Sequence, residues 1–433
     1  MAEFDGANEG SGLRGNPLSS LRYRDNRVFW IGTSFSSIGQ AAFLVASSWL
    51  AFRLGGSSAV GIVTFATMIP LFLATLAGGV LADRQERRRL VLASEAAQGI
   101  FALVIAFQAL RGAMSFAQLV VLVFLTGVAR AIEMPTVQTV LPSLVPRDEL
   151  LNIFSLNNLA NRGSRFVGPA LVATILELRG PAPAFLVIAL LYLLAMSQVV
   201  RVPRMHQAEV SQLNLREQVA EGVRYIAGHS PLGLLLLVIV LHCLLTMSFD
   251  STLPLFASQN LKGNGAIYST MVSAMGLGSI MAALLLASIH SQRGRGALLL
   301  IGGIGSGAAT ALMAISMNSL LALSAIFLVG VMTTWFMTLA NTMMQEAVPD
   351  GLRGRISGIY LMSASGVMSF GNLGAGYLAA QYGSAAVLGL PALGFIVLLL
   401  AFSVLRPALR RLYRAGSFSL DQAGAMEPVS AGD

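Results

Sequence analysis

Charged residues are scarce in this chain. Only 11% of the 433 residues are Asp, Glu, Lys or Arg, whereas soluble domains average about 25%. The sequence has one cysteine, Cys243, and four histidines. A single cysteine excludes an intrachain disulfide, and scattered histidines supply no metal cluster. A nucleotide-binding loop of the Walker type is also missing from the sequence. We therefore expect no metal, no cofactor and no enzymatic activity.

Long apolar segments dominate the chain. Hydrophobic residues make up 55% of the sequence, and its mean hydropathy is +0.73. Because a membrane-spanning helix needs about 20 mostly apolar residues, the length accommodates roughly a dozen spans. The predicted spans are residues 28–53, 59–82, 90–110, 115–141, 153–176, 183–203, 231–257, 265–290, 297–317, 319–346, 355–380 and 385–405. The sequence predicts an all-α membrane protein with twelve transmembrane helices.

Arginine and lysine are distributed unequally between alternate connections. If both termini lie on one side of the membrane, almost all basic residues fall on that side. The exceptions are Arg53, Arg111, Arg179 and Lys262 on the other side, and Arg130, Arg162 and Arg165 within predicted spans. Since basic loops stay in the cytoplasm, we expect both termini to be cytoplasmic in a bacterial inner membrane. The basic residues lie between apolar segments, so the net charge of +8 does not indicate a nucleic-acid partner.

Two stretches of the sequence repeat. Residues 136–180 align without a gap with residues 339–383, and the match includes a Val-Pro turn and several glycines. The repeat predicts two pseudo-symmetric six-helix bundles, the plan of transporters with a binding site near the midplane. The expected division is a tail at 1–27, a bundle at 28–203, a cytoplasmic linker at 204–230, a second bundle at 231–405 and a tail at 406–433. An amphipathic helix in the linker is expected to lie on the membrane or to pack on its own bundle.

The connection after the second predicted span carries a motif. Residues 78–92 read GGVLADRQERRRLVL, which resembles the signature G-x-L-A-D-R-x-G-R-R of the major facilitator superfamily, with Glu86 in place of glycine. The resemblance implies a cytoplasmic gate of Gly79, Asp83, Arg84, Arg87 and Arg88, with Arg353 and Arg355 as its counterparts in the second half. In such a gate Asp83 caps the helix that begins near Gly354. Arg87 is expected to pair with Glu133. The alternative is that these arginines only set the orientation.

Two further stretches narrow the resemblance. Residues 127–146 and 341–360 are similar to the branch of the superfamily that includes the bacterial enterobactin exporter and macrolide efflux proteins. Gly168 and Pro169 are similar to an antiporter motif of the superfamily, without its flanking glycines. The resemblance implies the major facilitator fold and the export of a small organic molecule.

Several ionisable and amide side chains lie inside predicted spans, where a charge costs about 2.5–3.5 kcal/mol on insertion scales. Arg130 and Glu133 share a helix face, as a local ion pair or as part of the transport pathway. The fifth span carries one polar stripe, consisting of Asn158, Asn161, Arg162 and Arg165. Lipid cannot satisfy these groups, so they must face protein or water. Arg165 is the best candidate for an acidic or carbonyl-rich substrate, and structural hydrogen bonding is the alternative.

The tenth and eleventh spans carry two more polar rows. The first consists of Thr334, Thr338, Asn341, Thr342 and Gln345 beside Trp335, and the second of Ser365, Ser369 and Asn372. Hydroxyls and amides beside an aromatic wall suit a moderately polar organic molecule. Bonds to their own helix backbone are the alternative for each hydroxyl.

Asp250 is the most isolated charge, with no charged residue within two helical turns along its span. It is a candidate proton carrier, with a substrate-contacting or structural acid as alternatives. His242 is expected to be a packing residue or a proton shuttle.

These patterns predict a monomeric secondary transporter that exports a drug, siderophore or other secondary metabolite, coupled to protons by alternating access. An importer or lipid transporter of the same fold is one alternative. A membrane sensor or scaffold without transport activity is another. The expected partners are the small-molecule substrate, protons and the lipid bilayer.

Overall fold

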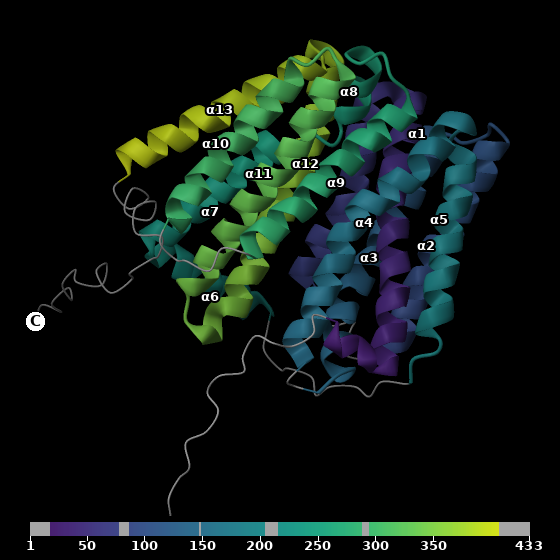
Figure 1. Ribbon diagram of the computed structural model, residues 1–433, viewed down its shortest axis with the longest axis horizontal. Coiled ribbons are helices and arrows are strands. Elements are labelled where there is room, and N and C mark those ends of the chain that lie inside the picture. Colours follow the sequence, from purple (N-terminus) through teal and green to yellow (C-terminus); the bar gives the residue numbers. More distant parts are fainter. Residues whose placement is uncertain (1–17, 78–85, 147–148, 204–214, 288–293, 407–433) are drawn as a thin grey trace, which may run out of the picture.

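The structure is a computed structural model that describes residues 18–77, 86–146, 149–203, 215–287 and 294–406 (Figure 1). These residues form helices and connections, and none of them forms a strand. The first half contains η1 (Ser19–Arg22), α1 (Arg24–Ala77), α2 (Arg87–Leu110), α3 (Phe116–Val140), η2 (Leu141–Ser143), α4 (Leu150–Leu178) and α5 (Pro181–Val199). The second contains α6 (Leu215–Gly228), α7 (Ser230–His242), η4 (Cys243–Met247), α8 (Leu253–Gln259), α9 (Gly265–Ala287), α10 (Arg295–Ala314), α11 (Ser319–Glu346), α12 (Asp350–Tyr382) and α13 (Ser384–Leu405). The all-α prediction is confirmed.

Helix α1 contains the first two predicted spans. Its 54 residues are broken at Gly55 and Gly56, and the φ of 70° at Gly56 is one that L side chains rarely adopt. A straight helix of this length would extend about 80 Å, more than twice the roughly 30 Å of a bilayer core. The break therefore divides α1 into two helices and lets it cross twice, in keeping with the two separate spans that the sequence predicts.

Eight helices of the described ranges are long and apolar enough to cross a membrane, or nine if the bent pair α6–α7 counts as one. Twelve crossings are reached if α1 crosses twice and if α4, α12 and the chain from α7 to α8 also cross. Helix α4 carries the polar stripe of the fifth predicted span, and α12 carries the polar row of the eleventh. The count of twelve stays a prediction.

The helices form two bundles, α1–α5 and α7–α13, that meet at one end and separate toward the other (Figure 1). We call the end with α6 and the start of α2 the linker end, and the end with Gly56 and α8 the opposite end. The bundles touch mainly along two helix pairs, α1–α12 and α4–α9, and α1 also contacts α8 and α9 near its break. A Cβ on Gly376 would lie 2.6 Å from the carbonyl oxygen of Ser57, and a Cβ on Gly276 would lie 2.5 Å from that of Arg165. Glycine permits these close approaches.

The apolar cores differ between the two ends. One cluster of buried side chains joins both bundles at the opposite end, with Phe43, Trp49 and Val60 from the first bundle and Leu253 and Tyr268 from the second. The other two clusters each belong to one side, one to α2–α5 with the start of α1 and one to α6–α13. The molecule is therefore closed at the opposite end.

Matching positions of the two halves adopt similar local structures. Gly180 and Gly383 have φ values of 78° and 81° and both precede a helix. Arg87 begins α2 and donates to the Thr139 carbonyl at 2.9 Å, while Arg295 begins α10 and pairs with Glu346 at 2.9 Å. The two halves are pseudo-symmetric, as predicted.

The linker helix α6 packs on its own side of the molecule. A Cβ on Gly222 would lie 2.6 Å from Cδ1 of Ile359 on α12, and Ile226 is buried. Glu221 forms an ion pair with Arg355 of α12. The structure therefore favours packing on the bundle over lying on the membrane, although Val223 is exposed.

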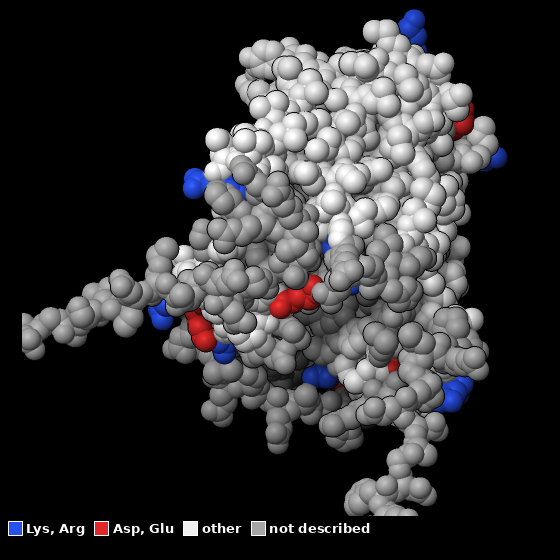
Figure 2. Space-filling view, turned by 60° about the vertical axis from the view of Figure 1, so that its left-hand side comes forward, with Lys and Arg blue, Asp and Glu red and all other residues white. Residues whose placement is uncertain are grey.

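The outer surface matches a bilayer. Figure 2 shows a broad uncharged area on its right-hand side, with the Lys, Arg, Asp and Glu atoms of the described residues above and below it. Large apolar side chains such as Leu193, Leu284 and Val397 are more than half exposed. Lipid accepts such surface, which would be unfavourable in water.

Candidate functional site

Three polar side chains of the α4 stripe are exposed. Asn158, Asn161 and Arg165 are open to solvent, and Arg162 is half-buried. The helical spacing places them on one face of α4, and Asn161 accepts a hydrogen bond from Ser37 of α1 at 3.1 Å. These side chains line the inner side of the first bundle.

The stripe faces charged groups on other helices. Arg165 acts electrostatically on Asp250 in the second bundle and on Arg130 of α3. Arg162 acts on Tyr360 of α12, also across the interface. Within the described residues, no carboxylate lies within 4.0 Å of any of the three arginines. Their guanidinium groups remain available for hydrogen bonds to a ligand.

Asp250 lies in a break of the seventh predicted span. The chain leaves α7 through the wide turn η4, loses helical structure over residues 248–252 and resumes as α8. Pro254 explains the break, because its ring would clash with the carbonyl of Asp250 four residues earlier in a continuous helix. The predicted span at residues 231–257 is therefore broken within its length, and Pro254 was the signal that could have revealed the break. None of the described residues donates a hydrogen bond to the Asp250 carboxylate.

Glu133 belongs to a buried cluster inside the first bundle. It accepts hydrogen bonds from Ser36 at 2.8 Å and from Gln98, which in turn accepts from Tyr192 at 3.0 Å. Arg130 acts on Glu133 electrostatically, without an ion pair between them among the described contacts. Glu133 therefore ties α1, α2 and α3 together, whereas Arg130 is half-buried beside the stripe.

The polar row of α11 is half-buried along its length. Thr338, Asn341 and Gln345 are each partly exposed, and Gln345 donates to the Asn341 side chain at 3.1 Å. The buried Nε1 of Trp335 has no partner among the described residues. His242 bonds to Ser306 at 2.9 Å and packs against the rings of Phe336 and Phe395, which favours the packing interpretation.

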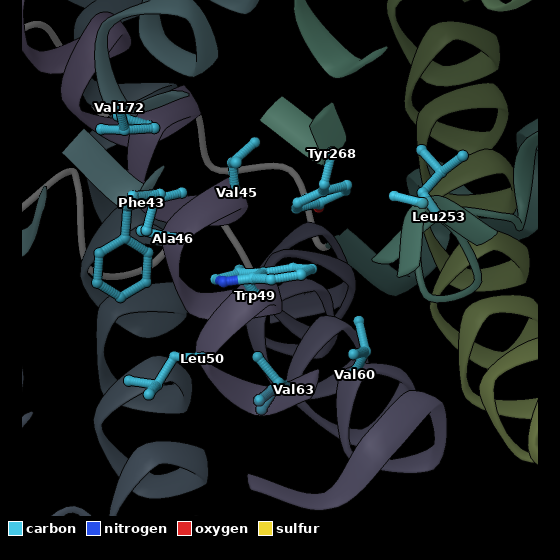
Figure 3. Close-up of a cluster of buried hydrophobic side chains, with 14 of the residues drawn as sticks. Phe43, Val45, Ala46, Trp49, Leu50, Val60, Val63, Val172, Leu253 and Tyr268 are labelled. Carbon is cyan, nitrogen blue, oxygen red and sulfur yellow. The ribbon is translucent and has the colours of Figure 1, made fainter. Parts of the chain in front are cut away.

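Aromatic rings close the site at the opposite end. The Trp49 ring of α1 stacks on that of Tyr268 of α9, with centroids 6.2 Å apart, and Leu253 lies on the other side of Tyr268 (Figure 3). Tyr268 also bonds to Ser48 and interacts electrostatically with Asp250. Trp49 and Tyr268 lie in different helices that are far apart in the sequence. Their contact therefore follows no helical periodicity, and the sequence did not predict it.

The gate motif is only partly described. Gly79, Asp83 and Arg84 lie outside the described residues, as does the side chain of Arg353. Arg87 donates to the Thr139 carbonyl at 2.9 Å and Arg88 to the Val200 carbonyl at 2.7 Å. The expected Arg87–Glu133 pair is therefore wrong for this conformation, because Arg87 is already bound and Glu133 is committed to the buried cluster. Arg355, the other expected residue of the second half, pairs with α6.

The pair Gly168-Pro169 lies in α4 where it crosses α1. A Cβ on Gly168 would lie 2.7 Å from the Ile38 carbonyl oxygen. Both residues are buried, and they bring α4 and α1 into close contact. The described residues contain no group of His, Cys, Asp and Glu that could hold a metal ion.

The chain resembles known exporters in sequence. The enterobactin exporter of Shigella boydii serotype 18 is 24% identical over 353 residues, which cover 80% of this chain and 84% of that protein. The enterobactin exporter of Escherichia coli O139:H28 matches with the same identity and coverage.

Solved structures of transporters share the fold. The nucleoside transporter NupG superimposes with a TM-score of 0.71 at 13% identity, covering 89% of this chain and 99% of that one. A POT family transporter bound to a thioalcohol-conjugated peptide gives a TM-score of 0.68 at 12% identity, covering 92% and 98%. A family model described as transmembrane secretion effector matches residues 15–424. The chain therefore belongs to the transmembrane secretion effector family of the major facilitator superfamily, and it is a multi-pass transporter of the bacterial inner membrane, not an enzyme.

Proposed function

We propose that the protein is a proton-coupled exporter of a small organic molecule and works by alternating access as a monomer. The linker end and both termini face the cytoplasm, consistent with the basic residues at that end. In the conformation described above, substrate enters from the cytoplasm or the inner leaflet. The bundles correspond to residues 28–203 and 231–405.

The observation that carries the proposal is the electrostatic influence of Arg165 on Asp250 across the two bundles, which are joined by an apolar cluster at the opposite end. Because Arg165 and Asp250 belong to different bundles, their interaction can respond to both ligand and proton. Charged side chains inside the membrane cost free energy, which favours a functional role for Asp250 and Arg165 over a structural one.

The polar groups of the site indicate the kind of substrate. Arg130, Arg162 and Arg165 offer donors to carbonyl or acidic oxygens, while Asp250 accepts from a hydroxyl or amide of the substrate. A substrate donor bound to the ionised Asp250 excludes the proton from the same oxygen atoms. Binding of substrate and proton is then mutually exclusive, which is the requirement for antiport. A siderophore, drug or other secondary metabolite with several carbonyl and hydroxyl groups fits this description.

Everted vesicles containing the overproduced protein test the proposal. The interior is made acidic, and uptake is measured for a panel of metabolites that begins with enterobactin, the substrate named for the relatives. We expect uptake driven by the pH gradient. Asp250→Asn should remove the dependence on the gradient, and Arg165→Ala should raise the KM roughly tenfold or more, the effect of losing a charged hydrogen bond.

An exposed residue directly after α4 provides a matched control. Arg179→Ala removes the same kind of charge as Arg165→Ala outside the site and should leave transport unchanged. Movement of substrate out of acidified everted vesicles would instead indicate an importer. No flux across the whole panel would support a sensor or scaffold.

A further inference from the structure

The break around Asp250 leaves backbone groups without helical partners inside the membrane. Lipid supplies no hydrogen bonds, so each freed N–H must find a partner in the protein. The Ser251 N–H donates to Oδ1 of Asn372 on α12 at 3.1 Å, and the Ser251 hydroxyl donates to the Asn372 carbonyl at 2.8 Å. Asn372, a residue of another helix, therefore provides the hydrogen-bond partner for the Ser251 N–H, directly beside Asp250 in the turn.

The Asn372 amide is held in one orientation. Its Nδ2 donates to the Met368 carbonyl at 3.0 Å, which directs Oδ1 toward Ser251. Asn372 and Ser251 are both completely buried. A Cβ on Gly371 would lie 2.6 Å from the Cβ of Ser248, so glycine is needed there for α12 to reach the break. The contact is closely packed as well as hydrogen-bonded.

The same residue lies at the interface between the bundles. A Cβ on Gly61 of α1 would lie 3.0 Å from the Asn372 carbonyl oxygen. Asn372 therefore contacts the broken span on one side and the first bundle on the other. The sequence placed Asn372 in a polar row with Ser365 and Ser369, but those two hydroxyls bond only to the backbone of their own helix.

We infer that Asn372 is a positioning residue that fixes the turn at residues 248–252 and thereby sets the position of the Asp250 carboxylate relative to the first bundle. This inference rests on the proposed function, because it assigns the positioning to a transport step. Arg165 of α4 and Tyr268 of α9 are the charged and titratable groups that act on Asp250. The described parts of α1 and α12 beside the break contribute hydroxyl, amide and aromatic groups instead.

The test compares Asn372→Ala with Ser369→Ala, which removes another fully buried polar group from the same helix. Hydrogen exchange is measured on the full-length protein for peptides that contain Ser251. Asn372→Ala should speed exchange of this amide roughly fivefold, the effect of losing one hydrogen bond. Ser369→Ala should leave it unchanged. Ser251→Ala, which keeps the backbone N–H bond, should have a smaller effect than Asn372→Ala and serves if that variant does not fold.

Transport by the same variants gives a readout that a merely structural role would not change. Asn372→Ala should move the pH midpoint of transport by about one unit, the order of a carboxylate–guanidinium interaction, while Ser369→Ala should not. Faster exchange without a change of midpoint would overturn the positioning role, as would equal behaviour of the two variants. If Asp250→Asn retains a normal pH profile, the proposed function fails even though the exchange result at Ser251 stands.

Discussion

Replacing Trp49 by leucine removes an aromatic ring that joins the two bundles at the closed end. The ring stacks on Tyr268 at a centroid distance of 6.2 Å and an interplanar angle of 22°. Leucine keeps an apolar side chain at this buried position but cannot stack. If the stack exists only while the opposite end is closed, the substitution should favour the conformation that is open at that end.

The expected size follows from the contact. An aromatic pair contributes about 0.5–1.5 kcal/mol beyond the area that it buries. Only interactions that differ between the two conformations move their equilibrium. Since about 1.4 kcal/mol corresponds to a factor of ten, the ratio of open to closed should rise roughly 2- to 12-fold. Packing of Trp49 on its own bundle, including Phe52 at 5.5 Å, does not enter this ratio if it is common to both conformations.

Thiol labelling measures the shift. Cys243, the only cysteine of the chain, is completely buried, so the parent protein provides the background. A cysteine introduced by Leu253→Cys lies in the same apolar cluster and is reached by a small water-soluble reagent only when the opposite end opens. Its labelling rate should rise by the same 2- to 12-fold, about the factor calculated from the stack.

Phe43→Leu is the matched control. Phe43 and Phe185 form a buried aromatic pair with centroids 5.6 Å apart, but both belong to the first bundle. Its loss should lower thermal stability without changing the labelling rate. Equal labelling in the Trp49 and Phe43 variants would refute the idea that the Trp49 stack holds the two bundles closed.

Two further substitutions test the packing. Gly276→Ala should lower thermal stability by about 1–3 kcal/mol through overpacking against the α4 backbone, whereas Gly163→Ala, with open space around its Cβ position, should have little effect; equal melting temperatures would contradict the close crossing. Glu133→Ala leaves the Ser36 hydroxyl without its acceptor, removes one of the two acceptors of the Gln98 amide, and should cost about 1–3 kcal/mol. Glu133→Gln keeps one acceptor oxygen and should cost less in the same melting assay, so the reverse order would count against the buried cluster.

The sequence predicted the features that the bilayer itself enforces. Apolar segments of spanning length were found because a helix must fill the hydrocarbon core. The repeat was found because both halves need the same turn chemistry, which Gly180 and Gly383 provide with nearly equal positive φ values. The stripe of α4 was visible because helical spacing alone places Asn161 and Arg165 on one face.

Contacts between helices that are far apart in the sequence produce no such periodic pattern. The expected Arg87–Glu133 pair relied on complementary charge, but Arg87 instead binds the Thr139 carbonyl, and any residue at position 139 would offer a carbonyl. The proximity of Arg165 and Asp250 depends on how the bundles dock, for which one sequence has no periodic signal. The break at Asp250 is different, because the proline four residues later was a readable signal.

The locations of Arg165 and Asp250 bear on the proposed mechanism. Arg165 lies where α4 crosses α9, since its carbonyl oxygen is the atom that a Cβ on Gly276 would meet at 2.5 Å. Asp250 lies in a turn tied to Asn372, where α12 crosses α1 beside Gly61. These two crossings are the main places where the backbones of the bundles come close, with smaller contacts of α1 with α8 and α9. If the bundles rock, points of backbone contact move least and the ends of the helices move most. Both charged groups would then stay at the pivot while each end opens in turn, as a site that faces both sides of a membrane requires.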